Sequence, residues 1–183
     1  MKKKKEGKKS KIFADILLRY FILIIAAIPN LWIFYSVFTP ITVYFVYFLL
    51  HFFFQASLSG STILLQNHFS IELIEACIAG SAYYLLLILN LSIPKINLKN
   101  RIKILFFCFL SFLIINVVRI LIMSFLLVSG SSWFDRVHLL FWYLGSVVFV
   151  IGIWFLGIKI FHVKDIPFYS DLKAIIRLRK KSS

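Results

Sequence analysis

The sequence predicts an all-α integral membrane bundle, with four full spans, one interfacial or re-entrant helix and a short extracytoplasmic β-hairpin. Of the 183 residues, 61% are hydrophobic and 21 are phenylalanine, an apolar share well above that of soluble globular domains. The chain also carries 21 Lys and Arg against 7 Asp and Glu. Most of these cations stand in short segments beside long apolar runs, which is typical of the cytoplasmic flanks of membrane spans. The net charge of +14 therefore indicates a membrane partner and no nucleic acid.

Four apolar runs are long enough to cross a hydrocarbon core of about 30 Å. They cover residues 17–38, 77–93, 102–126 and 138–160. If the lysine-rich N-terminus lies in the cytoplasm, four spans bring the basic segments 94–103 and 163–183 to that same side. The chain then divides into a basic cytoplasmic N-terminal tail over 1–16, a transmembrane domain over 17–162 and a basic cytoplasmic C-terminal tail over 163–183. The predicted location is the cell membrane, with several passes and both termini in the cytoplasm.

The segment between the first two predicted spans begins and ends on the outer side. Its first part, Ile41–Gln55, is apolar but carries polar side chains at helical spacing, which favours a helix lying in the outer interface or dipping part-way into the bilayer. This polar stripe consists of Tyr44, Tyr47, His51 and Gln55. The alternative is a fifth crossing with the stripe facing the bundle, which would place the basic 94–103 loop outside. Further on, Thr62–Gln66 and Phe69–Leu73 are rich in β-branched and apolar residues and predict the β-hairpin.

Cys77 is the candidate nucleophile. It opens the second predicted span at its outer end, where unpaired N–H groups and the positive end of the helix dipole favour a thiolate. Gly80, three residues on, leaves room for a neighbouring helix or a peptide backbone. Glu75 is a carboxylate that can orient a base, and the alternative is that it is simply solvated. The alternative is that Cys77 is an inert small hydrophobic residue. Cys108 lies near the inner end of its span and is expected only to pack.

Arg119 stands inside an apolar run, where a cation costs about 2.5 kcal/mol or more and is therefore typical of a functional site. Asn116 lies one helical turn earlier on the same face. An arginine and an asparagine together on an otherwise apolar helix are expected to face the interior of the bundle rather than lipid. The alternative is that Arg119 extends to the outer headgroups, since its side chain is long enough to reach them.

His138 opens the last predicted span, again at the outer end, where an interfacial histidine among aromatic residues is the alternative. Three helices thus supply a thiol, a guanidinium and an imidazole in the outer part of the membrane. These groups match the needs of cysteine acyl transfer, which uses a nucleophile, a stabiliser of the oxyanion and a general acid and base. No metal site and no other cofactor are expected, because no set of His, Cys and carboxylate residues has the spacing of metal ligands.

At these residues the chain resembles the exosortase/archaeosortase family of membrane transpeptidases, and in its compact length the archaeal members. The resemblance covers roughly residues 40–160. It rests on Glu75-Ala76-Cys77 followed by Gly80, on Asn116-Val117-Val118-Arg119-Ile120, and on His138. It implies a transpeptidase or protease that cleaves exported proteins at a C-terminal motif, followed in those proteins by an apolar span and a basic tail. The cleaved protein would pass to a lipid acceptor, at an outer-face site with Cys77, Arg119 and His138 as catalytic residues and Asn116, Gly80 and Glu75 as supporting residues.

Two positions depart from the family pattern. Family members often have Ser or Thr directly after the cysteine, where this chain has Ile78, and some archaeal members have Arg where His138 stands. Two other classes of function stay open. One is a non-enzymatic membrane subunit or transporter-like protein, in which Arg119 pairs with an acidic residue and Cys77→Ser is silent. The other is a membrane acyltransferase with a fatty acyl group on Cys77, which requires a cytoplasmic site.

Overall fold

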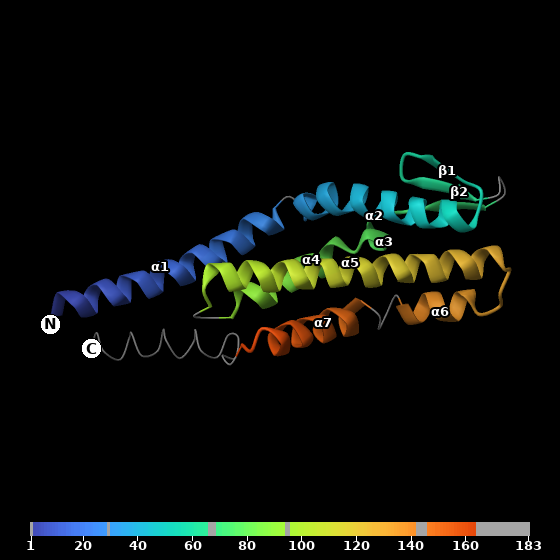
Figure 1. The fold of residues 1–183 in the computed structure, drawn as a ribbon. Coiled ribbons are helices and arrows are strands. Elements are labelled where there is room, and N and C mark those ends of the chain that lie inside the picture. The colour runs from blue at the N-terminus through green and yellow to red at the C-terminus, as the bar shows by residue number, and fades with distance from the viewer. Residues whose placement is uncertain (1, 29, 66–68, 94–95, 142–145, 164–183) are drawn as a thin grey trace.

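The computed structural model describes residues 2–28, 30–65, 69–93, 96–141 and 146–163. The helices form an elongated bundle, and a small sheet packs at one end of it (Figure 1). The elements in chain order are α1 (Lys2–Ala27), α2 (Trp32–Phe53), β1 (Ala56–Ser59), β2 (Thr62–Leu65), β3 (Phe69–Glu72), α3 (Glu75–Ile78), α4 (Gly80–Leu91), α5 (Leu98–Val128), α6 (Phe134–Leu140) and α7 (Ser146–Ile160). The predicted basic tail over 163–183 lies outside the described residues beyond Val163.

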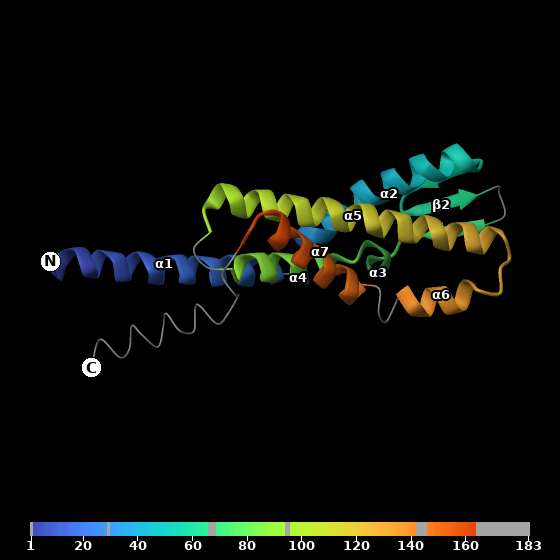
Figure 2. The ribbon, with the colours of Figure 1, turned by 60° about the horizontal axis from the view of Figure 1, so that its bottom comes forward.

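Two helices, α2 and α5, are long and apolar enough to cross a membrane by length and composition. Their 22 and 31 residues extend over about 33 and 46 Å at a rise of 1.5 Å per residue. They pack against each other, run in the same direction and both end near the sheet (Figures 1 and 2). The prediction of four full spans is wrong, because the other apolar helices in the described part of the chain are shorter.

The first predicted span, 17–38, divides between two helices. Asn30 and Leu31 have left-handed backbone angles, with φ of 48° and 60°, and such residues end the regular helical hydrogen bonding. The chain then continues as α2, which passes through Pro40 and takes in most of Ile41–Gln55. The prediction of a separate interfacial or re-entrant helix is therefore wrong. Proline is tolerated inside an apolar helix when neighbouring groups satisfy the freed carbonyl.

The second and fourth predicted spans are not single long helices either. Within 77–93, Ala79 adopts φ 58° and ψ 46° and separates the four-residue α3 from the 12-residue α4. Within 138–160, the described helices are the end of α6 and the 15-residue α7. Each of these helices is too short to cross about 30 Å of hydrocarbon by itself.

The sheet contains three antiparallel strands in the order β1-β2-β3. β2 and β3 pair within the segments predicted as a hairpin, with Thr62 opposite Glu72 and Leu65 opposite Phe69. β1 was not predicted from the sequence, and it pairs with the other edge of β2. Ile63 and Leu65 are fully buried and join the sheet to a core shared with α2 and α5. This core fixes the sheet beside the C-terminal half of α5.

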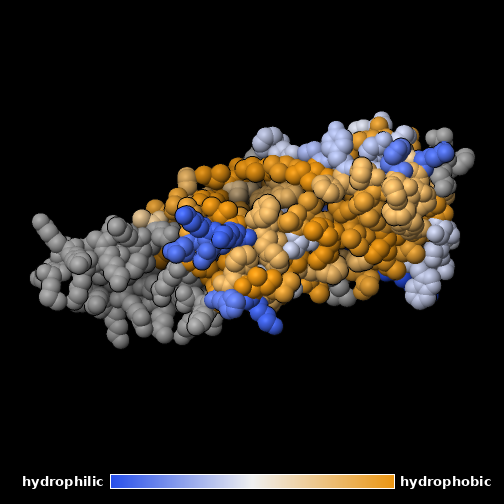
Figure 3. Space-filling view, viewed as in Figure 1, coloured by the Kyte–Doolittle hydropathy of each residue, from blue (hydrophilic) through white to orange (hydrophobic). Residues whose placement is uncertain are grey.

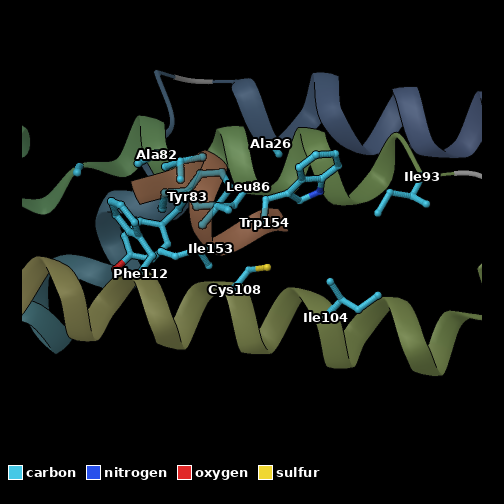
Figure 4. Close-up of a cluster of buried hydrophobic side chains, with 13 residues drawn as sticks. Ala26, Ala82, Tyr83, Leu86, Ile93, Ile104, Cys108, Phe112, Ile153 and Trp154 are labelled. Atoms are coloured by element: carbon cyan, nitrogen blue, oxygen red, sulfur yellow. The ribbon is translucent and has the colours of Figure 1, made fainter. Parts of the chain in front are cut away.

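A second core lies between α4, α5 and α7 (Figure 4). Cys108 is fully buried there, and a Cβ built on Gly157 would meet its sulfur at 3.2 Å. The close approach of α5 and α7 therefore depends on the missing side chain at position 157. Cys108 has the surroundings of a packing residue, in line with the expectation from its position in the sequence.

Two buried arginines close the end of the bundle far from the sheet. Arg19 Nη1 donates a hydrogen bond of 3.1 Å to the carbonyl of Leu91. Arg101 donates through Nη1 to the carbonyl of Asn90 and through Nη2 to that of Ile93, each at 2.8 Å. These carbonyls stand at or just beyond the C-terminal end of α4, where positive charge is favourable. The sequence pattern did not predict that these two arginines are buried.

The surface between the two ends is broadly apolar. On the face shown in Figure 3, hydrophobic residues form a wide band between hydrophilic groups at either end. On α2, Phe48 and Phe52 are 71% and 82% exposed, and on α5 Phe106 is 68% exposed. Contiguous exposed apolar surface of this kind is typical of contact with a membrane or a protein partner.

Candidate active site

One pocket of about 140 Å³ is lined by all three predicted catalytic residues. Cys77 comes from α3, Arg119 from α5 and His138 from α6. The pocket lies between β3 and α3 on one side and α5 and α6 on the other. Its other walls are mainly apolar, with Ile71 and Leu73 on the sheet side. Three polar groups that lie far apart in the sequence thus face one small cavity.

Cys77 is the third residue of α3 and is half-buried. The prediction that it opens a long helix is wrong, because the left-handed Ala79 separates α3 from α4. The dipole of a full span is therefore not available to its thiol. The positive group that acts on the thiol is the Arg119 guanidinium.

Three effects set the pKa of Cys77, which lies outside α2 and α5. Partial burial raises the pKa of the thiol, because the thiolate loses hydration, whereas the attraction of the Arg119 guanidinium and a backbone hydrogen bond with Ile74 both lower it. Burial is the larger effect, so the pKa lies above its ordinary value. A thiol of this kind needs a base to become a nucleophile, and His138 lines the same pocket.

Asn116 holds α3 against α5. It is buried, and its Nδ2 donates to the carbonyl of Cys77 at 2.8 Å and to that of Ile78 at 3.5 Å. These carbonyls lie beside the break at Ala79, where the regular helical ladder is interrupted. Arg119 follows Asn116 by almost one turn, is half-buried and lines the pocket, as expected for an arginine that faces the interior.

The other two supporting residues lie near the pocket without lining it. Gly80 is buried, and a Cβ at this position would lie 2.7 Å from Cε1 of Tyr35. The glycine therefore lets α2 approach the start of α4. Glu75 is exposed in the first turn of α3 and interacts electrostatically with Tyr35. Tyr35 was not among the site residues predicted from the sequence.

His138 is exposed within α6 and lines the pocket. Its ring stacks on that of Phe134, one turn earlier, with centroids 5.9 Å apart and an interplanar angle of 14°. The prediction that His138 opens a long span is wrong, since α6 begins at Phe134 and ends at Leu140. Among the residues the structure describes, no group of three His, Cys, Asp or Glu could hold a metal ion.

Comparison with protein-family models, with curated proteins and with solved structures found no match. The resemblance to exosortases and archaeosortases stays a prediction, and it rests on the residues quoted for it.

The apolar walls of the pocket were not predicted from the sequence. On α5 they include Met123 and Leu127, which follow Arg119 at intervals of four residues and so share its helical face. This four-residue spacing from Arg119 is the feature of the sequence that could have identified Met123 and Leu127 as pocket residues. Phe134 and the sheet residues Ile71 and Leu73 lie on other elements, so only the tertiary structure brings them to the pocket.

Proposed function

We propose that this protein is a membrane cysteine transpeptidase of the exosortase/archaeosortase type. It would cleave the C-terminal sorting signals of exported proteins at the outer membrane face and transfer the cleaved protein to an acceptor, which the resemblance suggests is a lipid. The observation that carries the proposal is the pocket shared by Cys77, Arg119 and His138. A thiol, a fixed cation and an imidazole around one cavity match the requirements of acyl transfer through a thioester.

The proposed reaction begins when His138 takes the proton of the Cys77 thiol. The thiolate then attacks the carbonyl carbon of the scissile peptide bond, and Arg119 stabilises the oxyanion that forms. The carbon–nitrogen bond breaks, the leaving amine takes the proton from His138, and the acyl group stays on Cys77 as a thioester. His138 next takes a proton from the acceptor, whose oxygen or nitrogen attacks the thioester. The departing sulfur recovers that proton from His138.

The proposed location is the cell membrane, with several passes and both termini in the cytoplasm. Lys99, Arg101 and Lys103 stand at the N-terminal end of α5, and short basic segments favour the cytoplasmic side. Because α2 and α5 run in the same direction (Figures 1 and 2), their sheet ends then lie at the outer face. The pocket would meet a substrate where its apolar anchor leaves the membrane.

The test is to follow processing of an exported protein that ends in a short motif, an apolar span and a basic tail. The protein would be expressed with each enzyme variant, and its mass would distinguish uncleaved, hydrolysed and transferred forms. Cys77→Ala should leave the substrate uncleaved, whereas the matched variant Cys108→Ala should still process it, because Cys108 is buried against Gly157. Full processing by Cys77→Ala would exclude thiol catalysis and favour a non-enzymatic role.

A further inference from the structure

β3 is an edge strand, and the direction of its backbone groups follows from the ladder. The Leu73 N–H donates to the carbonyl of Ser61 at 3.0 Å, which continues the register of β2 and β3. Hydrogen-bonded pairs alternate along an antiparallel ladder. The odd-numbered residues of β3 therefore bond to β2, whereas the N–H and C=O groups of Ser70 and Glu72 point away from the sheet.

The opposite edge of the sheet is covered. α2 packs along β1, and His51 Nδ1 lies 3.0 Å from the outward carbonyl of Ala56.

On β3, the Glu72 carbonyl accepts the Ile74 N–H at 3.2 Å. Within the described ranges, the outward groups of Ser70 and the Glu72 N–H have no backbone partner. An open edge of this kind is a template for another extended chain.

The open edge of β3 leads into the candidate active site. The end of the strand supplies Ile71 and Leu73 to the pocket wall, and the chain then enters α3 with Cys77. A cavity of about 140 Å³ is too small for a helix, whose diameter is about 10 Å with its side chains. Arg119 places positive charge on the far wall, where it can meet a substrate carbonyl. These features fit a single extended peptide.

We propose that β3 binds the substrate polypeptide by strand addition, with the Ser70 N–H and C=O and the Glu72 N–H bonded to an extended segment whose scissile carbonyl lies at Cys77. The inference rests on the proposed function, since it takes that polypeptide as the substrate. Main-chain bonds would provide affinity, and the apolar side chains around the pocket would select the side chains of the motif. The substrate must then be extended just outside its apolar anchor.

The test measures the rate at which Cys77 is alkylated in the full chain carrying Cys108→Ala. The sequence has two cysteines, so this substitution leaves Cys77 as the thiol that reacts. Three probes are compared: iodoacetamide, the capped peptide reagent acetyl-Val-Ala-Val chloromethyl ketone, and the same peptide with N-methylated backbone amides. The peptide should react faster than its N-methylated form by about two- to tenfold for each hydrogen bond lost. Ser70→Pro, which removes an outward N–H, should slow the unmethylated peptide by a similar factor and leave the iodoacetamide rate unchanged.

Ser70→Ala is the matched control, because it removes the hydroxyl but keeps the N–H and should leave all three rates unchanged. If the unmethylated and N-methylated peptides alkylate Cys77 at equal rates in the chain that carries Cys108→Ala alone, the proposal is overturned. This comparison does not depend on whether Ser70→Pro folds. Alkylation needs no turnover, so it is independent of the proposed reaction. If the peptide rates differ as expected while Cys77→Ala still processes substrate, the edge binds peptides and the catalytic proposal fails.

Discussion

The side-chain amide of Asn116 donates a hydrogen bond of 2.8 Å to the main-chain carbonyl of Cys77. This bond joins α5 to α3 beside the break at Ala79. The thiol is therefore placed relative to Arg119 through the backbone of residue 77, and not through its own side chain. Substitution of the Cys77 side chain should consequently change reactivity while leaving this connection intact.

Asn116→Leu should destabilise the protein by about 1–3 kcal/mol, because it leaves buried carbonyls without a donor. The measurement is thermal unfolding of the purified protein in detergent. Asn90→Leu is a matched control. The side chain of Asn90 is also buried, but both its amide atoms are without hydrogen-bond partners in the described structure, so this replacement should be neutral or stabilising. Equal losses in the two variants would show that the bond to Cys77 has no special structural role.

Gly80→Ala should destabilise the protein by about 1–3 kcal/mol through overpacking, since the new methyl group would lie 2.7 Å from the Tyr35 ring. The penalty should shrink when it is measured in a Tyr35→Ala background. Gly152→Ala serves as the control, because a Cβ at that position meets nothing within 4 Å. In a helix interior this change should stabilise by up to about 1 kcal/mol. A Gly80→Ala penalty that is unchanged by Tyr35→Ala would contradict the packing described here.

Arg119→Met should slow the alkylation of Cys77 by iodoacetamide at neutral pH and move its pH profile upward. The sign follows from charge: the guanidinium lowers the pKa of Cys77 against the larger effect of burial, so its removal leaves less thiolate. The rates would be measured across pH in the Cys108→Ala background. Arg136→Met is the control, since Arg136 lies over the Trp133 ring at 5.1 Å and should not alter the profile. Identical profiles for Arg119→Met and the parent would exclude this electrostatic contact.

The proposed orientation predicts which engineered cysteines react with an impermeant reagent applied to intact cells. In a background of Cys77→Ala and Cys108→Ala, cysteines at Ser59 and Ser132 should be labelled from outside, because both are exposed near the sheet end. A cysteine at Lys99, at the basic start of α5, should be labelled only after the cells are permeabilised. Labelling of position 99 in intact cells would reverse the orientation and move the pocket to the cytoplasmic face.

Two residues of the candidate site could be located from the sequence because a polar side chain is costly in an apolar run. Arg119 and Asn116 interrupt a run that is otherwise apolar, and such residues face protein rather than lipid. The same run forms α5, which covers the predicted segment 102–126. Long apolar runs without glycine or proline are the patterns that a sequence indicates most directly.

The breaks between helices could not be predicted in this way. Ala79 adopts φ 58°, although alanine is the strongest helix former and rarely enters the left-handed region. Pro40 lies inside α2 although proline normally interrupts a helix. In both cases the tertiary contacts override the local preference of the residue.

β1 was missed because its sequence, Ala56-Ser57-Leu58-Ser59, contains weak strand formers. Its stability comes from pairing with β2 and from packing of the strand against α2. Neither β2 nor α2 can be inferred as a partner of β1 from the four residues of the strand itself. The open edge of β3 could be recognised only after β1 had been placed at the other side of the sheet.

The central claim, that Cys77 forms a thioester with the substrate, is tested most directly by mass spectrometry of the Cys77 peptide. The unaltered protein would be expressed with the exported substrate and quenched in acid during turnover, and His138→Ala would serve as the comparison. A substrate-derived adduct should appear on Cys77 and not on Cys108, and neutral hydroxylamine should remove it. His138→Ala should show much less adduct, because its thiol lacks the base that the proposed reaction requires. Cleaved substrate together with unmodified Cys77, and continued processing by Cys77→Ala, would contradict the claim.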